Sequence, residues 1–245
     1  MKLTIPVIAL SLICGSSGLH AATSLLPISL PSFTDNILTY NDGAAYAPLY
    51  PASNQTLGGV PFKFESDASG NNIFLGGTLS APVTASLNIP INLPSITSAY
   101  ALINTIGGSP GIDSGSIKFE GTNGAIHEVD LIVGTHVRDH FFGAFGNTTT
   151  SPDTTESVFG TNAFGSAHYD MLKFDLPASF QGETLNNIVF TSDGPGLGGK
   201  AFLAALTVAQ TTSSGVPEPT FGISLLGLGA ALALSRRRRD RLQQD

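Results

Sequence analysis

The sequence is poor in the residues that most often build reactive or cross-linked sites. Its 245 residues include one cysteine, Cys14, and no tryptophan, and charged residues make up only 12% of the chain. A single cysteine cannot close an intrachain disulfide or supply a cysteine-based metal cluster. No stretch shows the periodicity of a long amphipathic helix. These absences exclude a disulfide-rich domain and argue against a helical fold.

The N-terminal segment has the pattern of a secretory signal peptide. Lys2 precedes the apolar stretch Leu3–Cys14, and the small residues Ala21 and Ala22 follow it. A basic start, an apolar run and a small-residue cleavage site are the three parts of such a signal. We predict a signal peptide over residues 1–21, with cleavage after Ala22 as the alternative. Cys14 would leave with it, so the mature chain would contain no thiol.

The C-terminal segment combines an uncharged apolar run, residues 220–235, with a basic end: Arg236, Arg237, Arg238 and Arg239. As a helix at about 1.5 Å per residue the run would reach about 24 Å, somewhat less than the roughly 30 Å hydrocarbon core of a bilayer. Snorkelling arginines accommodate such a mismatch and mark the cytoplasmic side. We predict a transmembrane helix over 220–235 and a cytoplasmic tail over 240–245. The alternative, a buried core helix, is disfavoured by three glycines in the run.

The residues before this run complete a tripartite signal. Val216, Pro217, Glu218 and Pro219, with the apolar run and the arginines, resemble the PEP-CTERM sorting signal over residues 216–239. The resemblance implies export from a Gram-negative bacterium, with the general secretion machinery and an exosortase as partners. It also implies cleavage near the Pro-Glu-Pro motif, contact with the membrane only through the helix before processing, and a place at the cell envelope or surface. Release, or association with exopolysaccharide or biofilm matrix, would follow.

The segment between the two signals is acidic. Of the eleven basic and eighteen acidic residues of the chain, five and fifteen fall between positions 22 and 215, which gives that part a net charge of −10. Nucleic-acid binding depends on neutralising phosphates with basic side chains. We therefore expect no nucleic-acid partner.

Short alternating apolar segments, separated by glycine, asparagine, serine and proline, fill residues 22–208. The pattern predicts strands at Val60–Phe64, Ile73–Leu75, Val83–Ile89, Ala99–Asn104, Ser116–Glu120, Ala125–Val133, Met171–Leu176, Ile188–Thr191 and Ala201–Val208. Many short strands with turn signals between them predict an all-β fold, a two-sheet β-sandwich with a jelly roll as the specific topology. Residues 209–215 are predicted to be a linker, and residues 146–157 an exposed loop.

Two smaller features concern turns. Asn123-Gly124, between the strands around Ile117 and Val129, predicts a hairpin with a type I′ turn. The loop Asp67–Asn72 offers oxygen ligands, so a structural calcium ion is an alternative to an ordinary turn there. Residues 22–51 are expected to be extended chain that wraps the sandwich or enters it late.

Three segments, Leu57–Phe62, Tyr100–Asn104 and Ala201–Val208, look similar to galactose-binding-like jelly-roll modules found in carbohydrate-binding domains. The resemblance covers about residues 34–208 and concerns framework residues. It implies a jelly roll and contact with glycans. Sugar sites usually stack rings on aromatic side chains; without tryptophan, only tyrosines such as Tyr46 and Tyr169 could do this, and strand tyrosines more often serve packing.

The segment 136–140 is the richest in chemically active side chains. We take His136, Arg138, Asp139 and His140 as candidate ligand-binding residues, with Arg138 as the planar fork for hydroxyl or carboxylate partners. On a strand, His136, Arg138 and His140 would share one face. Two imidazoles without a third ligand do not make a zinc site, so we expect no metal there. The structural alternative pairs Arg138 with an acid such as Asp170 or Asp175.

These features predict a non-catalytic exported protein with weak glycan contacts and no cofactor. One alternative is a purely structural surface protein without a ligand. The other is a glycoside-active enzyme, because two carboxylates in a cleft suffice for that chemistry. The acids available for it are Glu65, Glu120, Glu128, Asp130, Asp170 and Asp175.

Overall fold

The fold is described from a computed structural model, which covers residues 22–50, 54–76, 83–141, 148–151, 154–160, 167–194 and 198–212. The predicted signal peptide, sorting signal, transmembrane helix and cytoplasmic tail lie outside these residues. Within the described ranges, no helix combines the length and the apolar character that crossing a membrane requires.

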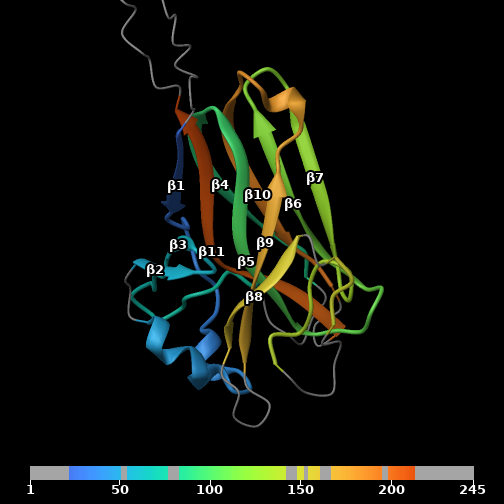
Figure 1. Cartoon of the computed structure of the whole chain (residues 1–245). Coiled ribbons are helices and arrows are strands. Elements are labelled where there is room, and N and C mark those ends of the chain that lie inside the picture. The colour runs from blue at the N-terminus through green and yellow to red at the C-terminus, as the bar shows by residue number, and fades with distance from the viewer. Residues whose placement is uncertain are drawn as a thin grey trace, which may run out of the picture. The chain divides into compact units, whose positions relative to one another are not determined.

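Strands dominate the described chain (Figure 1). In chain order they are β1 (Ala22–Ile28), β2 (Asn54–Leu57), β3 (Val60–Lys63), β4 (Ala85–Pro94), β5 (Ile96–Gly107), β6 (Asp113–Gly121), β7 (Ile126–Ile132), β8 (Thr155–Gly160), β9 (His168–Asp175), β10 (Thr184–Ser192) and β11 (Gly198–Thr212). The helical pieces are short 3₁₀ turns: η1 (Ile37–Thr39), η2 (Gly43–Leu49) and η3 (Ala178–Phe180). The predicted all-β class is confirmed.

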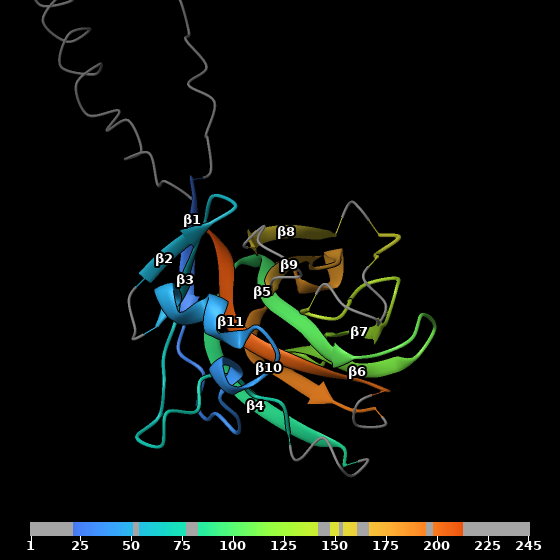
Figure 2. The same ribbon diagram turned by 90° about the horizontal axis from the view of Figure 1, so that it is seen from below.

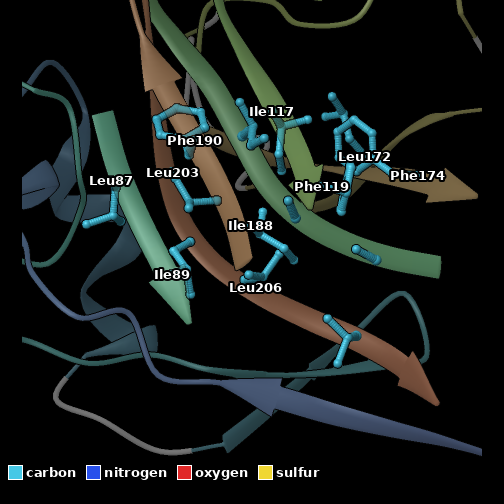
Figure 3. Close-up of a cluster of buried hydrophobic side chains, with 14 of the residues drawn as sticks. Leu87, Ile89, Ile117, Phe119, Leu172, Phe174, Ile188, Phe190, Leu203 and Leu206 are labelled. Carbon is cyan, nitrogen blue, oxygen red and sulfur yellow. The ribbon is translucent and has the colours of Figure 1, made fainter. Parts of the chain in front are cut away.

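Two sheets pack face to face. One has the order β1-β11-β5-β9-β8 and the other β4-β10-β6-β7; the short strands β2 and β3 form a third, two-stranded sheet that packs against β11. Apolar side chains of both sheets meet between them (Figure 3), among them Leu87, Ile117, Phe190 and Leu203. Along β4, Leu87 and Ile89 are buried whereas Ser86 and Asn88 are exposed, so the outer face of the four-stranded sheet meets water. The predicted sandwich of two sheets is therefore present.

The five-stranded sheet is covered on its second face as well. A second apolar cluster joins Phe202 and Tyr169 of that sheet to Tyr46 of η2 and Phe62 of β3. In Figure 2 the blue segment that carries η1 and η2 lies beside β11. Burial on both faces explains why β11 is a nearly continuous apolar run, with Ala201 to Ala209 all buried.

The strands β5 and β11 approach closely at one end, where both carry a pair of glycines. A Cβ placed on Gly108, whose φ is +116°, would lie 2.8 Å from the Cα of Gly199. Any side chain at this point would force the two backbones apart, and the positive φ independently favours glycine. The two glycines thus allow the backbones of β5 and β11 to approach closely near Val133, whose side chain lies next to both.

Most predicted strands overlap an observed one, but the sequence pattern missed three. These are β1, β2 and β8, whose residues are mostly exposed or half-buried. Without a buried face a strand shows little apolar alternation, which is why the first half of β8 fell in the predicted loop 146–157 and the rest was not predicted as a strand. The predicted strand Ile73–Leu75 instead makes isolated bridges to Asp35 and Leu203.

Two local predictions need correction. The β6–β7 hairpin exists, but its loop is closed by a bond from the Gly121 amide to the Ala125 carbonyl at 2.8 Å, and of its residues only Gly124 has a positive φ. A type I′ turn needs two such residues, so this is a three-residue loop with glycine in the left-handed position. At the C-terminal end of the described chain, β11 continues to Thr212, so Ala209–Thr212 is strand rather than linker.

Candidate functional site

The segment 136–140 is built into the five-stranded sheet. Pairing of β5 with β9 ends at Leu102↔Met171. Beyond that point the chain around Asp139 fills the gap: the Thr105 amide donates to the Arg138 carbonyl at 2.9 Å, and the His140 amide donates to the Thr105 carbonyl at 2.9 Å. On the other side the His168 amide donates to the His140 carbonyl at 2.8 Å. The segment is thus a wedge that completes the sheet where two strands separate.

Arg138 forms a two-pronged ion pair inside this wedge. Its Nε and Nη2 atoms each lie 2.7 Å from an oxygen of Asp170, a carboxylate that is fully buried. Asn104 supports the same carboxylate, donating from Nδ2 at 2.9 Å, while its Oδ1 accepts the Asp170 amide at 2.9 Å. Burial raises the pKa of Asp170, but hydrogen bonds from Arg138 and His168 outweigh it and hold the pKa below its usual value. The structure thus contains the ion pair that the sequence suggested as an alternative role for Arg138, with Asp170 rather than Asp175 as the acid.

His140 faces the second apolar cluster, under η2. Its Nδ1 lies 3.2 Å from the Tyr46 hydroxyl, which donates its own proton to the His168 carbonyl at 2.8 Å. Because that proton is used, Nδ1 of His140 must carry a hydrogen and donate to Tyr46. Burial, and then the neighbouring His168, lower the pKa of His140 to about 4. This imidazole is therefore neutral near pH 7 and packs as a core residue.

Asp139 is bonded to the backbone around it. It is 2% exposed, and its carboxylate accepts the Gly107 amide at 3.1 Å. Burial raises its pKa, and the hydrogen bonds it accepts from backbone amides counteract only part of that rise. Asp139 therefore ties the end of β5 to the wedge.

His136 is separated from the other three candidates. It lies in the turn before the wedge, where its carbonyl accepts the Thr155 hydroxyl at 2.8 Å and its Nδ1 lies 3.4 Å from the Ile132 amide. The expected common face of His136, Arg138 and His140 is wrong, because the chain turns between Gly134 and Val137 rather than running straight. His136 also lines a pocket.

That pocket, of about 280 Å³, lies where the edge strand β7 faces β9. Its lining residues come from β7, β9 and the connecting segments between them: His127, Val129, His136, Ser151, Thr154, Leu172, Lys173, Phe174 and Asp175. Leu172 and Phe174 belong to the core between the sheets, beside Phe119 (Figure 3). The pocket thus has an apolar floor and a polar rim.

The acids proposed for glycosidase chemistry are mostly bound to cations. Three pairs join residues two apart on one strand or its end: Lys63–Glu65 at 2.7 Å, Lys118–Glu120 at 2.8 Å and Lys173–Asp175 at 2.7 Å. Residues i and i+2 share a face of a strand, so the pairing follows from the sequence spacing. Asp170 is held by Arg138, and Glu128 accepts the Ser116 hydroxyl at 2.8 Å.

In the part of the chain that the structure describes, no group of three or more histidine, cysteine or acidic residues is arranged to hold a metal ion. In the loop Asp67–Asn72, the Asp67 carboxylate accepts the amides of Ser69 and Asn71, at 2.8 and 2.9 Å, and the Asn71 side chain at 3.0 Å. These bonds are those of an Asx turn.

Sequence reasoning missed the partners that give the wedge its structure: Asn104, His168 and Tyr46. Asn104 carried a usable signal, because an amide inside the apolar run Tyr100–Ile106 must find a partner when buried. Tyr46 and His168 stand in segments with no regular pattern, so their contacts follow only from the fold.

Comparison with known proteins adds no assignment: the chain matches no protein-family model and no curated protein sequence.

Proposed function

We propose that this chain is an exported surface or extracellular-matrix protein that an exosortase processes and that has no catalytic activity of its own. The PEP-CTERM-like signal at residues 216–239 and the predicted signal peptide at 1–21 support the proposal. The fold is compatible with it, since β1 begins at Ala22 and β11 ends at Thr212. Removal of both predicted signals would leave every described strand in place.

The domain itself would be a galactose-binding-like jelly roll that contacts extracellular polysaccharide weakly. Two sheets over one core, with the second face of one sheet open to water, support this assignment. The acidic charge of residues 22–215 keeps such a domain soluble and disfavours polyanions as partners.

The observation that carries the non-catalytic part is the state of the carboxylates. A glycosidase needs one protonated acid and one free base or nucleophile beside the scissile bond. Here Asp170 is buried with both oxygens on Arg138, and Glu65, Glu120 and Asp175 each bind a lysine. Cation binding by these four of the six candidate acids supports a domain without glycosidase activity.

A purely structural protein without a ligand is the second candidate. The wedge favours it, since Arg138, Asp139 and His140 all bond within the domain. In this case export and processing would be the only chemistry in which the chain takes part.

Two measurements test these proposals. The intact mass of the exported protein should correspond to an end near Pro217–Pro219; a mass that retains Arg236–Arg239 would contradict exosortase processing. Electrophoresis through gels that contain matrix polysaccharides should show retarded migration of the exported protein. Migration unchanged across all polysaccharides would favour the structural candidate, and release of reducing sugar would revive the enzyme.

A further inference from the structure

The pocket between β7 and β9 has a composition that specifies a class of ligand. We propose that it binds a single neutral, hydroxyl-rich ring, such as one pyranose unit of a polysaccharide. This inference rests on the proposed function and deepens it by naming the site and the type of sugar.

The floor of the pocket suits the C–H face of a sugar ring. Val129 of β7 and Leu172 and Phe174 of β9 line it, and the last two are 2% and 6% exposed. The ring of Phe119, in the same core, lies 5.7 Å from that of Phe174. Apolar C–H groups gain from leaving water for such a surface, without requiring a tryptophan.

The rim suits hydroxyl groups. His127, His136, Ser151 and Thr154 line it, and together these side chains offer both donors and acceptors, as sugar hydroxyls require. Because Nδ1 of His136 accepts the Ile132 amide, the proton of this imidazole is on Nε2, which is a donor. One face of the His127 ring packs on Phe119 at 5.9 Å and 22°, and this contact does not use the ring edge, where both nitrogens lie.

The charges around the pocket favour a neutral ligand. Lys173 and Asp175 border it, but strand alternation turns their side chains to the sheet face opposite Leu172 and Phe174. There their charges bind each other at 2.7 Å, with the side chains 41% and 71% exposed. No unbalanced charge from this pair is left to select an anion, and the domain as a whole repels one.

The size limits the ligand to one ring. Sites for small molecules usually measure about 300–1,000 Å³. At about 280 Å³ this pocket lies just below that range. A terminal or side-branch sugar therefore fits better than a continuous stretch of chain.

The test is binding of free sugars to the full chain, held in a detergent whose head group is not a sugar. We expect galactose or glucose to shift the NMR signals of the His127 and His136 rings, with affinity in the millimolar range. Glucuronate should bind more weakly. Absence of any shift, or tighter binding of glucuronate, would overturn the proposal without requiring a variant.

Variants locate the site. Thr154→Val removes a rim hydroxyl at nearly constant shape and should weaken binding about fivefold, the usual effect of one lost hydrogen bond. Ser151→Phe should fill the pocket and abolish binding. The matched control is Thr191→Val on the outer face of β10, where the hydroxyl lies 3.0 Å from that of Ser86. It should leave binding unchanged, and equal effects of all three would refute the site.

The same variants separate this inference from the proposed function. If Thr154→Val and Ser151→Phe proteins are retarded by matrix polysaccharide as strongly as the wild type, the pocket is not the site, although the matrix function stands. If even the wild type is not retarded and binds no free sugar, both fail.

Discussion

Replacement of Arg138 by methionine tests whether the wedge depends on its buried ion pair. Arg138→Met keeps most of the side-chain volume but leaves the Asp170 carboxylate without the cation that holds both of its oxygens at 2.7 Å. Asp170 is fully buried, whereas Arg138 is 16% exposed. Removing one partner of such a pair costs about 3–5 kcal/mol. For a domain of this size, each kcal/mol lowers the melting temperature by about 2–4 °C, so a fall of roughly 6–20 °C is expected.

The loss of unfolding free energy caused by Arg138→Met should become smaller as the pH falls. In the wild type the pKa of Asp170 lies below its usual value of 3.8, so its stabilisation is present above that pH and is lost as the pH falls below it. In the variant the cation is gone, and only the weaker bonds from Asn104 and His168 oppose burial, so the pKa of Asp170 should rise. The charged carboxylate then penalises the folded state at neutral pH, and protonation removes the penalty. The difference in unfolding free energy between the two proteins should shrink from pH 7 toward pH 4.

Urea unfolding at these two pH values measures both effects. Lys118→Met is the matched control, because Lys118 pairs with Glu120 at 2.8 Å on the outer face of β6, with side chains 33% and 31% exposed. A pair in contact with water is worth about 0–1 kcal/mol. A loss below 1 kcal/mol for Arg138→Met at pH 7, or one equal to the control, would refute the assigned role of the pair.

Two further predictions concern other parts of the domain. Burial lowers the pKa of His140 from 6.5 to about 4, so its contribution to stability is present above pH 6.5 and is lost as the pH falls toward 4. His140→Phe should therefore flatten the dependence of unfolding free energy on pH in that interval, and an unchanged slope would contradict the assignment. Gly108→Ala should lower the melting temperature more than Gly59→Ala. Both glycines have a positive φ, but only at Gly108 would the new Cβ meet backbone, 2.8 Å away; equal losses would show that the close approach is not limiting.

The fold class could be predicted because the apolar pattern of each central strand shows which of its faces are buried. In β4 the alternation of Leu87 and Ile89 with Ser86 and Asn88 marks a sheet with one wet face. In β11 the continuous apolar run from Ala201 marks a strand covered on both faces. Edge strands such as β8 lack a buried face, so their pairing comes from neighbours that are distant in the sequence.

The site could be predicted only as a list of residues. The sequence correctly offered pairing of Arg138 with an acid as one alternative, since a lone guanidinium in an acidic domain finds a carboxylate readily. It could not show that Asn104 and His168 join the pair, because these residues reach it from β5 and from the start of β9. Nor could it bring His127 to His136, whose proximity depends on how the edge of one sheet faces the other.

The separation of His136 from Arg138 has a general physical cause. A polar segment that completes a sheet must satisfy its side chains inside the protein, and Arg138, Asp139 and His140 do so with Asp170, Gly107 and Tyr46. Residues in the turn that leads to such a segment face no comparable demand, because part of their surface meets water. In this domain, the sequence segment richest in chemically active residues is therefore the segment that fills an irregularity of the sheet. The residue at its margin, His136, lines a pocket instead.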